Sequence, residues 1–206
     1  MRYVIVGNGI AGISAAEAVR QLDPSGHVTL IGDETALPYS RPMISMVLDG
    51  STPLEKLPIR GPGIYEDLNI ETRFGDRISE IDAGQHEVVI EGGKRVPFDR
   101  LLIATGADAR PVEVPGTDLK NIYTMRTEAH VRHIIQTLPT VRNPLVLGGG
   151  LVGFKAAYGL LKRGLKPTML ITSAYPLSMQ VDEVAGKMIL DELVRHGLTV
   201  RVGISV

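Results

Sequence analysis

The sequence predicts an α/β protein in which one strand–turn–helix arrangement occurs twice. In the first copy the β-branched run Arg2–Val6 leads into the turn G-N-G-I-A-G, and in the second copy Leu145–Leu147 leads into G-G-G-L-V-G about 140 residues later. Between the copies, much of residues 70–91 alternates apolar and polar side chains, which is typical of strands. These observations predict two Rossmann-like three-layer units, the second incomplete, with a β-meander inserted into the first.

Each glycine of the first turn has a separate task in this interpretation. Gly7 permits the tight turn, Gly9 lets the main chain approach a diphosphate, and Gly12 allows the following helix to pack closely on the strand. The N–H groups at Ile10 and Ala11 open that helix, at the positive end of its dipole. A diphosphate would bind there, although a glycine-rich turn alone also occurs where nothing is bound.

An acidic pair after the second strand favours a dinucleotide over an empty turn. Val28–Ile31 reads as the second parallel strand, and Asp33 and Glu34 follow it. Asp33 stands 21 residues after Gly12, near the spacing of about 20 residues at which a carboxylate binds the ribose hydroxyls of a dinucleotide. The first unit is therefore predicted to bind a dinucleotide.

The other elements of the first half follow from apolar periodicity and from proline and glycine. Pro38 and Pro42 stiffen a loop over residues 37–45, and this loop carries Arg41, whose fork matches phosphate oxygens. Further on we expect a loop at 58–63, a short helix at 64–69, meander strands at 70–74, 77–82 and 87–91, a hairpin turn at 92–94, and a buried strand at 100–106 that ends in small residues. Small residues would let a cofactor lie against the main chain.

Residues 107–118, which contain Pro111 and Pro115, are expected to link two domains. We place the first domain at residues 1–112 and the second at 113–206. The second half is predicted to hold a short strand at 122–125, a helix at about 127–138, the strand 143–147, a helix at 154–163, a strand at 169–171, a helix at about 182–196 and a strand at 198–202.

Composition excludes several classes of function. The net charge is −1 without a basic cluster, so a nucleic acid or an anionic membrane has no electrostatic support. No apolar run is long enough to span a bilayer, and the first strand begins at Arg2 with no room before it for a signal peptide, so we expect a cytoplasmic protein. With no cysteine, and with histidines that lack ligand spacing, we expect no metal site, disulfide or thiolate nucleophile.

Together these residues resemble the flavoproteins with two dinucleotide-binding domains, the pyridine nucleotide–disulfide oxidoreductase-like family. The motifs that carry the resemblance are G-N-G-I-A-G, L-P-Y-S-R-P at 37–42, L-I-A-T-G-A at 102–107 with Arg110, and L-G-G-G-L-V-G. Within the family they are similar to the branch of rubredoxin and ferredoxin reductases, the flavin part of NAD(P)H nitrite reductases, and apoptosis-inducing factor. The resemblance implies FAD on the first turn and NAD(P)H on the second.

The resemblance also implies which residues contact each cofactor. Asp33 and Glu34 would hold the adenosine ribose of FAD, and main chain at Ile78 would meet the adenine. The remaining FAD residues would be Arg41 and Arg110 near the phosphates or the isoalloxazine, and Ala104, Thr105 and Gly106 along the flavin. NAD(P)H would be held by Gly148, Gly150, Leu151, Val152 and Gly153, while Lys155 would either pair with a phosphate or remain solvated.

The implied function is that of an oxidoreductase. Electrons would pass from NAD(P)H through FAD to a rubredoxin- or ferredoxin-like protein or a fused redox centre, with no catalytic side chain because the flavin carries the chemistry. Two alternatives stay open: an NADH oxidase or quinone-type reductase that uses oxygen or a small acceptor, and a non-catalytic dinucleotide-binding protein. Disulfide and peroxide reduction, which need a cysteine, are excluded for this chain.

Two departures from the family pattern bear on these expectations. About 20 residues past Gly153 the chain reads Ile171-Thr172-Ser173, with neither a carboxylate nor a positive charge, so the choice between NAD and NADP stays open. The family also continues past the equivalent of Val206 with a segment that contacts the flavin. We therefore expect a truncated chain that binds FAD weakly or not at all, from a full-length flavoenzyme for which a homodimer is one option.

Overall fold

The computed structural model describes residues 1–110 and 112–204, and the predicted linker residue Pro111 lies outside the described residues. Residue contacts divide the chain into two compact units, each made of two segments. The first unit comprises Met1–Ser40 and Pro58–Asp108, and the second comprises Arg41–Leu57 and Ala109–Val206. The assignment of a cofactor to each domain stays a prediction.

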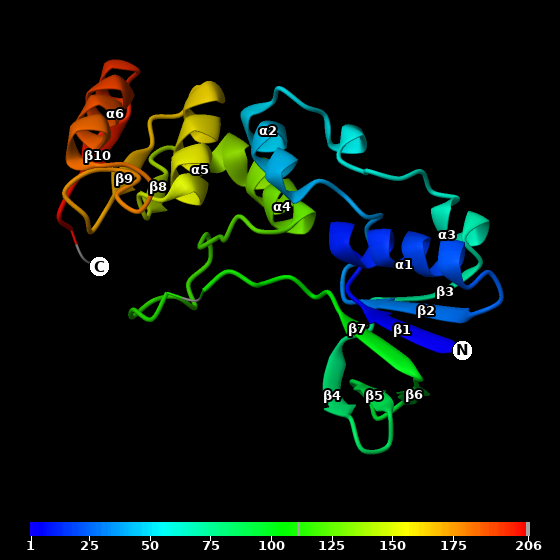
Figure 1. Cartoon of the computed structure of the whole chain (residues 1–206). Coiled ribbons are helices and arrows are strands. Elements are labelled where there is room, and N and C mark those ends of the chain that lie inside the picture. Colours follow the sequence, from blue (N-terminus) through cyan, green and yellow to red (C-terminus); the bar gives the residue numbers. More distant parts are fainter. Residues whose placement is uncertain (111, 205–206) are drawn as a thin grey trace. The chain divides into compact units, whose positions relative to one another are not determined.

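The first unit is built on a four-stranded parallel sheet of order β3-β2-β1-β7. Helix α1 packs on one face of this sheet, and a three-stranded antiparallel meander of order β4-β5-β6 packs on the other (Figure 1). The elements are β1 (Arg2–Val6), α1 (Ile10–Leu22), β2 (His27–Gly32), α3 (Ile64–Asp67), β3 (Ile70–Phe74), β4 (Ile78–Asp82), β5 (Glu87–Ile90), β6 (Arg95–Pro97) and β7 (Arg100–Ile103). The predicted α/β class with an inserted meander is confirmed.

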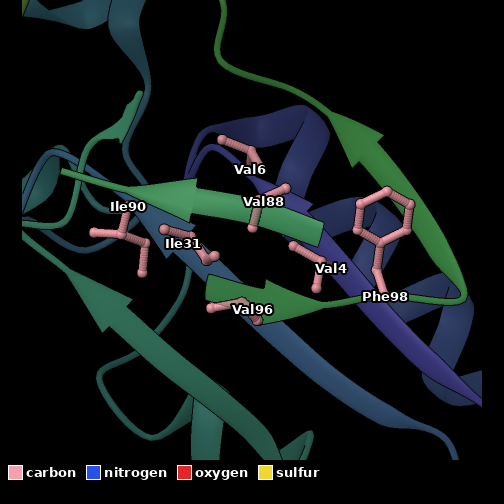
Figure 2. Packing of buried hydrophobic residues seen from close by; sticks show 7 residues of the cluster. All are labelled: Val4, Val6, Ile31, Val88, Ile90, Val96 and Phe98. Atoms are coloured by element: carbon pink, nitrogen blue, oxygen red, sulfur yellow. The ribbon is translucent and has the colours of Figure 1, made fainter. Parts of the chain in front are cut away.

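Alternate residues of the parallel strands build two separate cores, because successive side chains of a strand point to opposite faces. Figure 2 shows the core between the sheet and the meander, which consists of Val4, Val6, Ile31, Val88, Ile90, Val96 and Phe98. The core beneath α1 consists of Ile5, Ile13, Ala16, Val28, Leu30 and Tyr65. Strands β1 and β2 are thus buried on both faces, which accounts for their continuous apolar runs.

The prediction that residues 70–74 open the meander is wrong. These residues form β3, which pairs in parallel with β2 from Val28–Ile70 to Gly32–Phe74 and so belongs to the main sheet. A parallel strand needs a crossover, and the segment that contains α3 supplies it. The alternating sequence I-E-T-R-F indicates a half-exposed strand. An edge strand of the parallel sheet and a strand of the meander would both show this alternation, so the sequence does not distinguish them.

The meander itself agrees with the sequence pattern. Strands β4 and β5 pair antiparallel, and β5 and β6 form a hairpin around the predicted turn. Gly92 and Gly93 in that turn have φ of +94° and +88°, in the left-handed region that favours glycine. The predicted hairpin turn is confirmed.

Strand β7 is an edge strand, and its predicted burial is wrong. In the described sheet it pairs only with β1. The side chains of Leu102 and Ile103 are consequently 40% and 59% exposed. A short apolar run predicts a strand but does not distinguish a central strand from an edge strand.

An ion pair fastens the first strand to the residue that precedes β7. Arg2 Nη2 lies 2.7 Å from Asp99 Oδ1, and the main-chain N–H of Arg2 donates to Asp99 Oδ2 at 2.7 Å. The N–H of Asp99 in turn donates to the Arg2 carbonyl at 2.9 Å. Hydrogen bonds from the side chain and the main chain of Arg2 stabilise the carboxylate and lower the pKa of Asp99 from 3.8 to about 2.

We expect the stabilisation by this carboxylate to be complete at neutral pH and to be lost as the pH falls from about 4 to about 2. The pKa is lower in the folded chain than in the unfolded chain, so the unfolded chain takes up the proton first and acid favours unfolding. Melting temperatures of the wild type and of Asp99→Asn test this expectation. Their difference should shrink as the pH falls from about 4 and should vanish only below about pH 2, and a difference that is the same at neutral pH and in acid would contradict the expectation.

The second unit is built on a three-stranded parallel sheet of order β10-β9-β8. Its elements are α2 (Ile44–Asp49), α4 (Glu128–Thr137), β8 (Leu145–Leu147), α5 (Leu151–Lys162), β9 (Thr168–Leu170), α6 (Glu183–Arg195) and β10 (Thr199–Arg201). The side chains of Thr127 and Asp182 cap α4 and α6, and the predicted starts of these two helices are confirmed. No helix in the described part of the chain is long and apolar enough to cross a bilayer.

Two local predictions fail in this unit. Residues 122–125, predicted as a strand, form no strand. The Tyr123 ring packs edge-on against His133, with 5.1 Å between ring centroids, and the Thr124 hydroxyl lies 3.2 Å from His130 Nδ1. The segment therefore packs against α4. The predicted loop 37–45 also ends early, because Arg41–Met43 forms a 3₁₀ turn and α2 begins at Ile44.

Packing on α5 explains why α2 forms. A Cβ built at Gly159 of α5 would lie 2.9 Å from Leu48 Cγ, so this glycine makes room for the α2 side chain. Arg163 then donates from Nε to the Leu48 carbonyl at 2.8 Å and from Nη2 to the Val47 carbonyl at 3.0 Å. These carbonyls belong to the last turn of α2, where helical partners are missing. The arginine therefore caps one helix from the end of another.

Candidate nucleotide-binding sites

The first glycine turn brings the ends of three neighbouring strands together. Gly7 has φ of +115°, and its N–H donates to the Ile31 carbonyl of β2 at 2.7 Å. A Cβ at Gly7 would lie 2.2 Å from the carbonyl oxygen of Ala104, which follows β7. A Cβ at Gly12 would lie 1.9 Å from the Gly7 carbonyl oxygen. Only glycine satisfies both approaches, because real Cβ atoms do not come this close to main chain.

The start of α1 is open where an anion would bind. The N-cap residue is Gly9, which makes no side-chain cap hydrogen bond, and a Cβ built on Gly9 would meet nothing within 4 Å. The N–H of Ile13 bonds the Gly9 carbonyl at 3.0 Å and begins the helical ladder. The preceding amides, at Ile10 and Ala11, point from the positive end of the helix dipole. The open space at Gly9 and the amides at the helix start together suit the diphosphate of a dinucleotide.

The second turn repeats this geometry. Gly148 has φ of +104°, and its N–H donates to the Leu170 carbonyl of β9 at 2.9 Å. A Cβ at Gly153 would lie 2.1 Å from the Gly148 carbonyl oxygen. Gly150 is the N-cap of α5 and makes no side-chain cap hydrogen bond, and a Cβ built on it would meet nothing within 4 Å. The Gly150 carbonyl accepts a hydrogen bond from the Phe154 N–H at 2.9 Å. Leu151 and Val152 supply the first helical amides and are exposed.

The matching hydrogen bonds align the two units residue by residue. Ile31 in β2 and Leu170 in β9 accept from corresponding glycines, so they occupy equivalent positions. Counting two and three residues onward, Thr172 stands where the first unit has Asp33, and Ser173 stands where it has Glu34. Hydroxyl groups thus replace the two carboxylates at the end of the second strand.

The acidic pair of the first unit stands at the carboxyl edge of its sheet, as predicted. Asp33 is exposed, and Glu34 is half-buried and accepts a hydrogen bond from the Tyr39 hydroxyl at 2.7 Å. Asn8 in the turn donates to the Ala36 carbonyl at 3.0 Å and accepts from the Tyr65 hydroxyl at 3.0 Å. Asn8 thus holds the loop after β2 beside the turn, a contact that the sequence did not reveal.

The other predicted FAD residues divide between the two units. The N–H of Ala104 donates to the Val6 carbonyl at 2.7 Å, which places the exposed Thr105 and Gly106 next to the first turn. Ile78 of β4 packs against the core beneath the meander. Arg41 and Arg110 belong to the second unit, where Arg41 Nη1 donates to the Arg126 carbonyl at 3.3 Å. The roles predicted for these residues, and for the exposed Lys155 of α5, stay predictions.

The loop that follows β9 contacts the second turn. Leu177, with φ of +57°, donates its N–H to the Gly149 carbonyl at 2.8 Å. Ile171 fills the space beside the same glycine, because a Cβ at Gly149 would lie 2.6 Å from Ile171 Cγ2. The Tyr175 ring occupies the space that the missing side chain of Gly186 leaves on α6. The segment that follows β9 is thus anchored at both ends.

A basic residue that the sequence analysis missed lies beside the hydroxyl pair. Arg201 of β10 is paired in register with Leu170 of β9, and its carbonyl accepts from the N–H of Ile171 at 2.9 Å. The residues directly after β9 carry no positive charge, and Arg201 lies in the neighbouring strand. The strand order β10-β9-β8 corresponds to β3-β2-β1 in the first unit. Aligning the third strands of the two units would have identified Arg201 from the sequence.

Among the described residues no group of three or more histidine, cysteine or acidic side chains could hold a metal ion. His130 and His133, which are spaced one helical turn apart on α4, contact Thr124 and Tyr123 instead.

Comparison with known proteins gives a consistent picture. The model of the family described as pyridine nucleotide-disulphide oxidoreductase matches residues 1–206. The chain is 30% identical over 199 residues to the assimilatory nitrate reductase electron transfer subunit of Bacillus subtilis, covering 96% of this chain and 26% of that protein. It is 30% identical over 207 residues to rhodocoxin reductase of Rhodococcus erythropolis, covering 100% of this chain and 48% of that protein. The ferredoxin–NAD(+) reductase subunit of the Pseudomonas putida benzene 1,2-dioxygenase system is 35% identical over 168 residues, covering 81% of this chain and 40% of that protein.

Solved structures agree with these matches. The covalent putidaredoxin reductase–putidaredoxin complex matches with a TM-score of 0.92 at 29% identity, over 100% of this chain and 50% of that chain. NADH:rubredoxin oxidoreductase from Clostridium acetobutylicum matches with a TM-score of 0.90 at 26% identity, over 99% of this chain and 53% of that chain. The chain thus spans between about a quarter and about half of the length of the proteins it matches.

Proposed function

Because the chain belongs to the pyridine nucleotide-disulphide oxidoreductase family, we propose that it forms the nucleotide-binding part of an NAD(P)H-dependent flavin reductase. FAD binds at the turn Gly7–Gly12 and NAD(P)H binds at the turn Gly148–Gly153.

One observation carries this proposal, namely that two separate turns share one geometry. Each has a left-handed first glycine, an N-cap glycine with open space above it and a third glycine pressed against the first carbonyl. Each helix start therefore offers uncapped amides to a diphosphate. Two dinucleotides on one chain suit a transfer of electrons between nucleotides rather than the storage of a single one.

The residues of the first unit fit FAD more closely than a mononucleotide. Asp33 and Glu34 can accept hydrogen bonds from the adenosine ribose, and the exposed main chain at Thr105 and Gly106 leaves room for the flexible remainder of the ligand. When bound, FAD supplies the hydride-accepting chemistry, and the protein supplies placement and electrostatics. No side chain of the chain is assigned as an acid or a base.

The proposed acceptor is a small iron–sulfur or iron protein of the ferredoxin or rubredoxin kind. The relatives that are at least 30% identical include reductases named for rhodocoxin and ferredoxin, and one solved structure holds a reductase joined to putidaredoxin. Oxygen, a quinone or a fused redox centre as acceptor would be recognised by turnover of NAD(P)H without the added redox protein.

Binding of two nucleotides at separate sites tests the proposal. We expect the purified chain to quench FAD fluorescence and, independently, to bind NADPH, with one site for each. Titrations should extend to about 1 mM because weak affinity is expected. Gly150→Ala places a methyl group in the open space at the second turn, so it should lower NADPH affinity at least about tenfold and leave FAD affinity unchanged.

Competition of FAD and NADPH for a single site, or the absence of both ligands from the chain at the highest concentrations, would show that the two turns are not two dinucleotide sites. A Gly150→Ala variant that loses both ligands together would mean that the methyl group disturbs the fold instead.

A further inference from the structure

We propose that the second turn prefers NADP(H) over NAD(H), and that Arg201 and Thr172 together recognise the 2′-phosphate. This inference rests on the proposed function, since it concerns which form of the nucleotide occupies that turn. The two units of the chain have glycine turns that are alike, but they differ at the end of the second strand of each.

The first difference is the loss of negative charge at the end of the second strand. In the alignment given by the matching hydrogen bonds of Gly7 and Gly148, the carboxylates Asp33 and Glu34 are replaced by Thr172 and Ser173. A carboxylate here accepts hydrogen bonds from ribose hydroxyls and repels a phosphate on the same ribose. A hydroxyl donates to a phosphate oxygen without that repulsion.

The second difference is an arginine that has lost its acidic partner. Register pairs Arg73 with Ile31 in the first sheet and Arg201 with Leu170 in the second, so the two arginines correspond. Arg73 Nη2 lies 2.6 Å from Glu71 Oε1, but Thr199 occupies the position equivalent to Glu71.

In the part of the chain that the structure describes, no carboxylate lies within ion-pair distance of Arg201, which is exposed. Its guanidinium is therefore available to an anion, in the fork geometry that suits a phosphate.

The main chain holds the arginine and the hydroxyls side by side. The N–H of Ile171 donates to the Arg201 carbonyl at 2.9 Å, and the N–H of Gly203 donates to the Ser173 carbonyl at 3.1 Å. The nearest following acids are engaged elsewhere, because Asp182 caps α6 and Glu183 pairs with Lys187 at 2.6 Å. The Ser173 hydroxyl donates to the Tyr175 carbonyl at 2.7 Å. Among the residues that the structure describes, the carboxyl edge formed by β9 and β10 thus offers the Thr172 hydroxyl and the guanidinium of Arg201.

Calorimetric titration of the chain with NADPH and with NADH tests the inference. We expect NADPH to bind at least about tenfold more tightly, because a charge-assisted hydrogen bond to the added phosphate is worth this factor or more. Arg201→Gln should weaken NADPH binding about tenfold and leave NADH binding within about twofold. The matched control is Arg195→Gln, which removes an exposed arginine paired with Glu192 on α6 and should change neither affinity.

A second variant adds charge instead of removing it. Thr172→Asp restores a carboxylate at the position of Asp33 and should reverse the preference towards NADH. NADH binding as tight as NADPH binding in the wild type, or Arg201→Gln weakening both nucleotides equally, would overturn the inference and leave the proposed function standing. Binding of neither nucleotide would overturn both.

Discussion

Replacing Gly12 with alanine should lower the free energy of unfolding of the first unit by about 3 kcal/mol or more. The added Cβ would lie 1.9 Å from the carbonyl oxygen and 3.0 Å from the carbonyl carbon of Gly7. Both atoms are main chain in a turn that is also fixed to Ile31 and pressed against Ala104, so no flexible side chain can move aside. Urea denaturation followed by far-ultraviolet circular dichroism measures the loss.

Gly9→Ala is the matched control for this substitution. Gly9 has φ of −87°, and a Cβ there would meet nothing within 4 Å, so stability should change by less than about 1 kcal/mol. The same methyl group would stand where the diphosphate is proposed to bind, and FAD affinity should fall at least about tenfold. Equal destabilisation by both alanines would show that the turn does not have the described geometry.

Arg20→Lys should cost about 3 kcal/mol of stability although the charge is kept. The Arg20 guanidinium donates to the carbonyls of Asp23, Pro24, Gly26, Leu68 and Asn69, at distances from 2.7 to 3.2 Å. It thereby joins the loop after α1 to the turn before β3. A lysine ammonium cannot span these directions, and the half-buried carbonyls would be left without donors. Thermal and urea melting measure the effect.

Arg77→Lys provides the comparison in the same unit. Arg77 Nε lies 3.9 Å from Glu91 Oε1, and both side chains are more than 60% exposed. An exposed pair of this kind contributes at most about 1 kcal/mol, so the substitution should be almost neutral. If the two lysine variants melted at the same temperature, the five hydrogen bonds of Arg20 would not stabilise the first unit.

The features that the sequence predicted are those written in local patterns. The glycine spacing of Gly7, Gly9 and Gly12 predicts the turn because each position has a steric requirement that only glycine meets. Apolar periodicity likewise predicts α4, α6 and the strands that are buried on both faces. The two turns, the acidic pair and the meander hairpin were therefore all accessible before the structure.

The features that escaped prediction depend on residues far apart in the chain. β3 joins the parallel sheet because its crossover contains α3, and β7 is exposed because β1 is its only described neighbour. Helix α2 depends on Gly159 and Arg163, more than a hundred residues later. Arg201 meets the end of β9 only through sheet register. No local pattern records such pairings.

The near-identity of the two glycine turns separates the binding of a diphosphate from the choice between dinucleotides. The backbone of Gly7–Gly12 and that of Gly148–Gly153 would grip a diphosphate alike, so the turns cannot tell one dinucleotide from another. Under the proposed function, discrimination between dinucleotides would fall to the few residues that follow β2 and β9 and to the strand beside each. Exchanging residues 33–34 with 172–173 should therefore alter the preference for the ribose substituent, and a full exchange of that preference would also need the residues at positions 73 and 201.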